Sequence, residues 1–213
     1  MIKRILQVVV IALVMSWVAG AIAEVPDDAT KIQPLGVGEM APVFDAHLVD
    51  GDLYRFDPGQ RSHPSVLIFY RGGWCPYCNN HLKEMQDAEP VLLDLGFEVL
   101  FLSADRPEIL YSSLRQEMPN YTLLSDASME VSRAFGIAFV VDDATLARYK
   151  KAGLDLEAVS GYPHHQLPVP AVFVIDAAGV IQFVYANPDY RVRLDAEPLL
   201  EMAREVLPPA IGE

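Results

Sequence analysis

The chemistry of this chain centres on two cysteines. Cys75 and Cys78 are the only cysteines among 213 residues, and both lie in the stretch RGGWCPYCNN at residues 71–80. A disulfide between them would close almost no loop, so it would hardly constrain the unfolded chain. A purely structural disulfide is therefore disfavoured, which leaves electron transfer or metal binding.

One of the two residues between the cysteines favours electron transfer. Pro76 suits the first position of a helix, which makes Cys75 its N-cap. At an N-cap the sulfur meets unpaired backbone N–H groups and the positive end of the helix dipole, and both favour a thiolate. We therefore expect the pKa of Cys75 to lie below the free value of about 8.5. Cys78 follows one turn later on the buried side, where it is placed to attack a mixed disulfide on Cys75.

Two neighbouring side chains are candidates for support of the reactive sulfur. Trp74 offers an apolar platform beside it, although ordinary core packing gives the same residue type. If the Arg71 side chain turns inward, its charge stabilises a thiolate. The alternative is that Arg71 is a solvated cation at the end of a strand.

Metal binding is the rival use of the cysteines. His81 continues the spacing of Cys75 and Cys78 on one helical face, and His164 and His165 occur later in the chain. A structural zinc site needs four ligands, and the chain has no second cysteine pair. We therefore predict no metal and no cofactor other than a redox-active Cys75–Cys78 disulfide, and keep a metal-binding module as the non-enzymatic alternative.

The elements around the cysteines indicate how they are positioned. The apolar run Val66–Tyr70 predicts a strand buried on both faces, and it ends just before the cysteines. Apolar residues then recur at helical spacing from Cys78 to Leu92, with Gly96 as a stop. An Asp50-Gly51 turn predicts a hairpin between the runs 43–49 and 53–56. Further strands are predicted at 97–103, 121–124, 171–176 and 180–185, and further helices at 107–118, 128–135, 143–152 and 195–207.

This order predicts an α/β fold, with a mixed sheet flanked by helices on both faces. It carries an N-terminal β-hairpin extension and an insertion at about 137–168. A reactive group is expected at the carboxyl end of a central strand, which is where Cys75 lies. We expect the insertion to cover one side of this site, because long insertions are often functional.

The first residues have the pattern of a secretory signal. A basic start at Lys3 and Arg4 precedes an apolar stretch and the small-residue site Ala21-Ile22-Ala23. The sequence thus divides into a signal peptide at 1–23, a linker at 24–35 and one domain at 36–213. Export to the periplasm is the preferred location, and secretion or an uncleaved membrane anchor are the alternatives.

The charge of the chain limits its partners. The formal net charge is −13 at pH 7. Such a surface argues against sequence-independent binding to nucleic acid or to anionic lipid. Contact with a membrane is expected only if the signal stays uncleaved.

A strand followed by WCPYC at the start of a helix resembles the thioredoxin superfamily. The run Leu167–Phe173, LPVPAVF, resembles its proline loop, which implies a cis Pro170 facing the cysteines and a Val169 backbone offered to a thiol substrate. The segments MAPVFDAHLVDGDLYRF, EVLFLSADRPE, LLSDASMEVSRAFGIA and PAVFVIDAAGVIQFVYANPDYRVR are more similar to one branch, the peroxiredoxin-like alkyl hydroperoxide reductase/thiol-specific antioxidant group. The resemblance covers roughly residues 36–207.

The sequence departs from that branch at two positions. Gly72 stands where peroxiredoxins have a Thr or Ser, and Pro170 stands where they have an arginine that polarises peroxide. Phe69 also replaces the buried carboxylate of thioredoxins, so proton transfer at Cys78 needs another group, with His81, Glu84 or water as candidates.

These departures favour an exported thiol–disulfide oxidoreductase as the first hypothesis. A peroxiredoxin-like thiol peroxidase, an antioxidant with Cys75 peroxidatic and Cys78 resolving, is the second. The implied partners are a protein or small-molecule disulfide, or a hydroperoxide, together with a reducing or oxidising redox protein.

Overall fold

The computed structural model describes residues 24–113 and 122–207. The predicted signal peptide, the last five residues of the predicted helix 107–118 and the first residue of the predicted strand 121–124 lie outside these ranges. Within them, no helix is long and apolar enough to cross a membrane.

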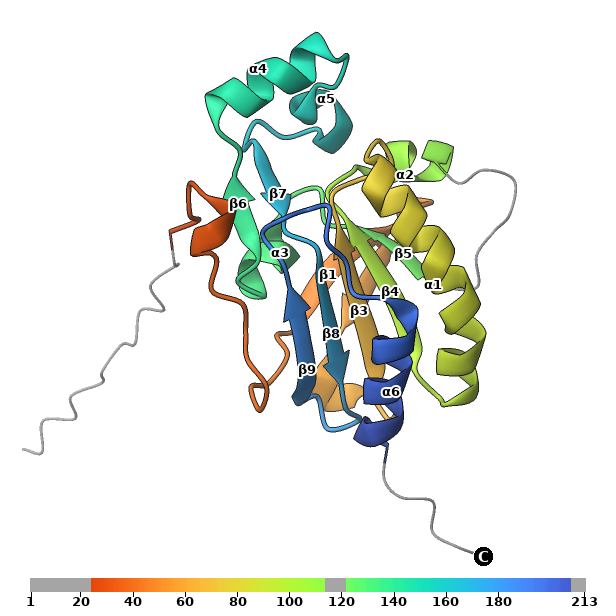
Figure 1. The fold of residues 1–213 in the computed structure, drawn as a ribbon. Coiled ribbons are helices and arrows are strands. Elements are labelled where there is room, and N and C mark those ends of the chain that lie inside the picture. The colour runs from red at the N-terminus through yellow and green to blue at the C-terminus, as the bar shows by residue number, and fades with distance from the viewer. Residues whose placement is uncertain (1–23, 114–121, 208–213) are drawn as a thin grey trace, which may run out of the picture.

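The centre of the fold is a seven-stranded mixed sheet in the order β2-β1-β5-β4-β3-β8-β9 (Figure 1). Its strands are β1 (Phe44–Leu48), β2 (Leu53–Phe56), β3 (Ser65–Tyr70), β4 (Glu98–Ser103), β5 (Thr122–Ser125), β8 (Ala171–Ile175) and β9 (Ile181–Ala186). The strand β3 is central, parallel to β4 and antiparallel to β8, and all six of its residues are buried. The continuous apolar run of this strand is explained by burial on both faces.

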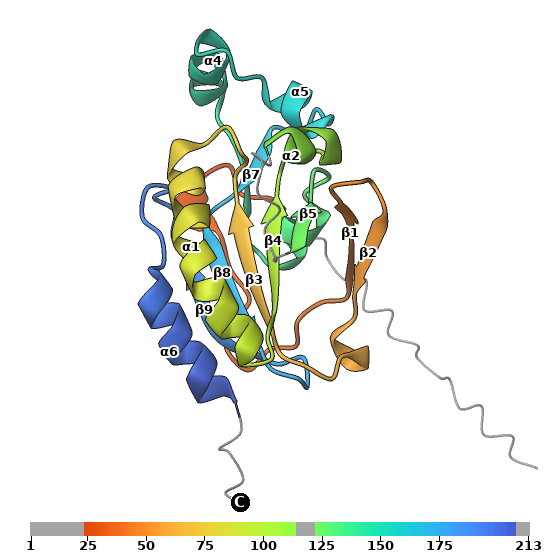
Figure 2. The ribbon, with the colours of Figure 1, turned by 90° about the vertical axis from the view of Figure 1, so that its right-hand side faces the viewer.

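Both faces of the sheet are covered. On one face, α1 (Pro76–Asp94) packs beside α6 (Ala196–Val206), and Leu110 of α2 (Pro107–Ser113) joins the same apolar cluster (Figure 2). On the other face, α3 (Glu130–Ala134) contributes Val131 to a second cluster that contains Phe69 and Phe135. The predicted α/β fold with helices on both faces is confirmed, and so is the N-terminal hairpin of β1 and β2.

The helix that carries the cysteines begins as the sequence predicts. Cys75 is its N-cap and Pro76 occupies its first turn. Its buried residues include Cys78, Met85 and Leu92 at the predicted helical spacing, together with His81, whereas Leu82 of the predicted apolar pattern is only half-buried.

The insertion forms a small substructure at the carboxyl end of the central strands. It consists of β6 (Ala138–Val140), α4 (Asp143–Lys151), α5 (Leu156–Ser160) and β7 (Gln166–Pro168), and β6 pairs with β7 in a separate two-stranded sheet. Figure 1 shows α4 and α5 beyond the end of the sheet at which α1 starts. The helix predicted at 143–152 is confirmed. The strands β6 and β7 were not predicted, because three-residue runs carry no readable periodicity.

The segment predicted as a linker lies against the domain. The backbone N–H of Val140 donates to Pro26 at 2.8 Å, and that of Gln33 donates to Gly136 at 3.2 Å. Gly136 is required there, since a Cβ on it would lie 2.0 Å from the Gln33 carbonyl oxygen and its φ is +71°. Residues 24–35 are thus packed rather than extended away from the fold.

A candidate active site at the start of α1

The two cysteines follow the carboxyl end of β3, with Cys75 at the N-cap of α1 and Cys78 in its first turn. Cys75 is 2% exposed and Cys78 is fully buried. Both are free cysteines. Cys75 contributes to a pocket of about 380 Å³, whereas Cys78 does not line it. The pocket is otherwise lined by Arg71, Trp74, Pro76, Tyr77, Tyr149, Ala152, Gly153, Leu154 and Tyr190.

The surroundings of Cys75 favour its thiolate. A hydrogen bond from the Cys78 thiol is the largest cause that lowers the pKa of Cys75, to about 6, and the charges of Arg71 and Arg193 act in the same direction. Burial opposes them. The sequence predicted the direction of this pKa shift, with capping N–H groups as the cause. The backbone N–H of Cys78, in the first helical turn, does lower the pKa of Cys75, but the Cys78 thiol has the larger effect.

The surroundings of Cys78, in contrast, disfavour its thiolate. Its burial raises its pKa well above the usual value, and a thiolate on Cys75 raises it further. One cation opposes this, because Nη2 of Arg193 donates to Sγ of Cys78 at 3.1 Å. Arg193 lies between β9 and α6, far from the cysteines in sequence, and sequence reasoning missed it.

Arg71 turns inward. It is 4% exposed, its Nη2 donates to the hydroxyl of Tyr149, and its guanidinium lies 4.3 Å from the ring centroid of Tyr190 and 5.2 Å from that of Trp74. Its position between these rings brings a fixed positive charge beside Cys75. Tyr149 belongs to α4, so the insertion does border the site.

A buried carboxylate supports the loop before the cysteines. Asp105, at the end of β4, accepts hydrogen bonds from the Gly73 N–H at 2.8 Å and from Nε1 of Trp74 at 3.0 Å. A Cβ on Gly72 would lie 2.3 Å from that Nε1 and 2.7 Å from the Asp105 carboxylate. The space that a Thr or Ser side chain would need is therefore filled by Trp74 and Asp105.

Asp105 also responds to the thiols. Burial is the largest cause that raises its pKa to about 6, and a negative charge on Cys78 raises it too. Sequence reasoning missed this residue. The only local signal was its place directly after a buried strand, at the edge of the sheet where the cysteines were expected.

The proline loop lies differently from the expectation. No cis peptide bond occurs within 24–113 and 122–207, so the prediction of a cis Pro170 is wrong. The loop continues from β7 into β8 in trans, the more stable form of an X–Pro bond, with the Val169 N–H bonded to Ile137 O and Pro170 O accepting from Asn187. Val169 and Pro170 line a neighbouring cavity rather than the pocket of Cys75.

Two side chains, His81 and Glu84, were named from the sequence as candidates for proton transfer at Cys78. His81 is buried, which lowers its pKa to about 4, and its Nε2 lies 3.0 Å from the Leu194 carbonyl oxygen. Glu84 is exposed on the outer side of α1.

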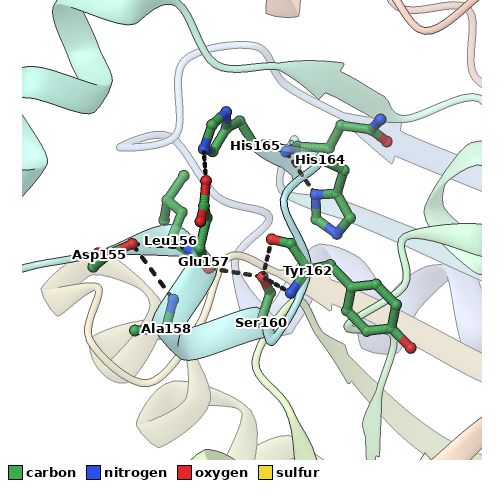
Figure 3. A network of polar contacts seen from close by, with 9 residues as sticks. Asp155, Leu156, Glu157, Ala158, Ser160, Tyr162, His164 and His165 are labelled. Carbon is green, nitrogen blue, oxygen red and sulfur yellow. Dashed lines mark hydrogen bonds and ion pairs between the residues drawn. The ribbon is translucent and has the colours of Figure 1, made fainter.

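The two later histidines, His164 and His165, lie in the insertion and make hydrogen bonds there. His164 bonds to the Ala127 carbonyl oxygen at 2.8 Å. His165 bonds to Glu157 of α5 at 2.7 Å, as Figure 3 shows. In the described part of the chain, no group of three or more His, Cys, Asp or Glu side chains is placed to hold a metal ion. The metal-binding alternative thus gains no support.

Comparison with known proteins identifies the family of this chain. The model of the AhpC/TSA family matches residues 37–184. The chain is 32% identical over 108 residues to peroxiredoxin Bcp of Escherichia coli K12, covering 50% of this chain and 67% of that protein. It is 30% identical over 106 residues to a putative peroxiredoxin bcp of Haemophilus influenzae, covering 50% and 68%.

Solved structures support the fold. Peroxidoxin BcpB from Mycobacterium tuberculosis superposes with a TM-score of 0.61 at 19% identity, covering 82% of this chain and 99% of that one. A peroxiredoxin-like protein from Aquifex aeolicus gives a TM-score of 0.60 at 19% identity, covering 82% and 90%. The prediction of a thiol-dependent enzyme with a thioredoxin-like fold is confirmed. The chain belongs to the AhpC/TSA family.

Proposed function

We propose that this protein is a thiol peroxidase in which Cys75 is peroxidatic and Cys78 is resolving. One observation carries the proposal: the pKa of Cys75 is lowered to about 6 in a pocket that also holds the Arg71 guanidinium, with the Cys78 thiol hydrogen-bonded below. A thiolate beside a fixed cation is the arrangement that attacks an electrophilic oxygen. Family membership supports the same choice between the two enzyme hypotheses.

In the first step, the Cys75 thiolate attacks the terminal oxygen of a hydroperoxide. An S–O bond forms, the O–O bond breaks, and Cys75 becomes a sulfenic acid. The leaving alkoxide, or hydroxide from hydrogen peroxide, takes a proton from water. Arg71 stabilises the charge that develops on the leaving oxygen, because its guanidinium is held among aromatic rings and needs no reorganisation.

In the second step, Cys78 attacks the sulfur of the sulfenic acid. The S–S bond forms, the S–O bond breaks and hydroxide leaves. Asp105 takes the proton from the Cys78 thiol and returns it to the leaving hydroxide, which departs as water. The coupling between the charges of Asp105 and Cys78, and a carboxyl pKa of about 6, support this role. Arg193 stabilises the attacking thiolate of Cys78.

In the third step, a reducing redox protein restores the thiols. Its dithiol supplies two electrons and two protons to the Cys75–Cys78 disulfide and becomes a disulfide itself. The redox-active disulfide is the only redox group that this cycle requires.

Disulfide exchange is the second candidate. Gly72 favours it, because the loop has no space for the hydroxyl that peroxiredoxins carry at this position. In this reaction, Cys75 would attack a substrate disulfide and Cys78 would resolve the mixed disulfide.

A stopped-flow comparison separates the two candidates. The reduced protein is mixed with hydrogen peroxide or with a protein disulfide, and oxidation of Cys75 is followed. We expect peroxide to react faster by more than about tenfold. Faster reaction with the disulfide would refute the peroxidase proposal. A Cys78→Ser variant is expected to accumulate sulfenic acid, which a dimedone label detects by mass.

We further propose that residues 1–23 direct export and are then removed. Their basic start, apolar stretch and small-residue site support this. N-terminal sequencing of the protein from a periplasmic fraction tests it, with Glu24 as the expected first residue. Recovery in the cytosol with residues 1–23 intact would contradict it.

A further inference from the structure

A second cavity lies behind the active site. It has a volume of about 180 Å³ and lies between α4 and the loop Pro168–Pro170. We call it the proline cavity, lined by Ala29, Arg71, Phe139, Val141, Asp142, Thr145, Arg148, Tyr149, Pro168, Val169, Pro170, Pro188 and Tyr190. It shares Arg71, Tyr149 and Tyr190 with the pocket of Cys75, so the Arg71 guanidinium borders both spaces.

Arg71 carries an unused hydrogen-bond donor here. Arg71 is only 4% exposed, and its Nε makes no hydrogen bond. No ion pair among residues 24–113 and 122–207 includes it. When Cys75 is a neutral thiol, this buried cation has no ion-pair partner among the described residues, which is costly, so an anion bound beside the guanidinium would offset its charge.

The rest of the cavity combines apolar walls with one more cation. Seven of the thirteen lining residues are apolar, including Phe139, Val141 and three prolines, and prolines offer no backbone N–H. Arg148 is exposed at the border of the cavity and donates only to the Thr145 hydroxyl. The single acid, Asp142, is exposed and caps α4 by accepting from the Thr145 N–H at 2.9 Å.

We propose that the proline cavity binds a small organic acid, with its carboxylate on Arg71 and Arg148 and its apolar body against Phe139 and the prolines. The bound carboxylate neutralises part of the Arg71 charge. That charge favours the Cys75 thiolate, so occupancy of the cavity weakens the thiolate and slows its reaction with peroxide. The kinetic consequence rests on the proposed peroxidase function, whereas binding of the acid does not.

Binding is tested with benzoate and its uncharged analogue benzamide on the purified, reduced protein. Isothermal titration or ligand-observed NMR gives the two affinities. We expect saturable benzoate binding, with benzamide weaker by about tenfold or more because it lacks the charge. Equal affinities would overturn the proposal.

Variants of α4 locate the site. Arg148→Gln is expected to weaken benzoate about three- to tenfold and to leave benzamide unchanged. Thr145→Phe fills the cavity and is expected to abolish both. Lys150→Gln removes a cation from the same helix but outside the cavity, and is the matched control. Benzoate binding that resists both Arg148→Gln and Thr145→Phe would place the acid elsewhere and refute the proposal.

A second readout ties the cavity to Cys75. In a Cys78→Ser variant, the rate of Cys75 alkylation by iodoacetamide, measured as a function of pH, reports ionisation of Cys75. Saturating benzoate is expected to raise its midpoint, and benzamide is expected to leave it unmoved. Benzoate that binds without moving the midpoint would refute the link through Arg71. Both readouts remain informative if the protein proves not to reduce peroxide.

Discussion

The guanidinium of Arg193 donates through Nη2 to the sulfur of Cys78 at 3.1 Å. It is oriented by a second hydrogen bond, from its Nε to the Tyr190 carbonyl oxygen at 3.0 Å. This contact joins the loop before α6 to the first turn of α1. The positive charge of Arg193 opposes the effect of burial on the pKa of Cys78.

We predict that Arg193→Gln slows formation of the Cys75–Cys78 disulfide by about ten- to a hundredfold, the usual worth of a hydrogen bond to a charged group. The first reaction of Cys75 with peroxide is expected to change much less. Double-jump stopped-flow kinetics separates the two steps. Arg191→Gln is the control, because Arg191 is exposed and pairs with Asp189. Equal effects of the two substitutions would contradict the role of Arg193.

We predict that the rate of the peroxide reaction rises with pH through about 6, following ionisation of Cys75. The rate is expected to increase about tenfold between pH 5 and about pH 8, and to stay constant at higher pH. Because this pKa is depressed in the folded state, the stability it contributes is full above about pH 8.5 and is lost as pH falls through about 6. A rate profile measured with hydrogen peroxide checks this, and a midpoint near 8.5 would show that the site does not stabilise the thiolate.

We predict that Asp105→Asn slows disulfide formation and spares the peroxide step, because an amide cannot take the proton from Cys78. The substitution also leaves the Gly73 N–H or the Trp74 indole without an acceptor, at a cost of about 1–3 kcal/mol. Asp126→Asn is the matched control: Asp126 is equally buried, its burial raises its pKa to about 6, and it bonds Ser132 and Val131 on α3. Similar slowing in both variants would indicate a stability effect rather than proton transfer.

We predict that Gly72→Ala lowers the free energy of unfolding by about 1–3 kcal/mol, since its Cβ would collide with Trp74 and Asp105. Urea unfolding measures the loss. Gly51→Ala is the control, since Gly51 also has a positive φ, of +92°, but a Cβ there meets nothing. Equal losses of stability in the two variants would show that the loop before Cys75 can shift to make room for a side chain. A hydroxyl at position 72 would then be tolerated.

The parts of the site that local sequence encodes could be predicted. A buried strand, a proline in the first helical turn and two cysteines one turn apart are all neighbours, so their arrangement follows from helix geometry. The direction of the Cys75 pKa shift followed from the same reasoning, although its main cause did not.

The residues that meet the thiols from elsewhere could not be predicted. Arg193 is 115 positions from Cys78, and Asp105 is 31 positions from Trp74. In the sequence each is an ordinary charged residue in a loop, and only the order of the strands brings it to the site. The cis Pro170 was wrong for a related reason, because a resemblance in sequence does not fix the isomer of a loop that here continues directly between two strands.

The position of Trp74 allows the active site to be followed by tryptophan fluorescence. The chain has two tryptophans, Trp17 within the predicted signal and Trp74 beside Cys75. The Trp74 ring lies 5.9 Å from that of Tyr149, and its Nε1 is held by Asp105. In a chain that starts at Glu24, all indole emission arises within the active site. That form therefore contains its own optical reporter, and each oxidation of Cys75 can be followed in real time without an added dye.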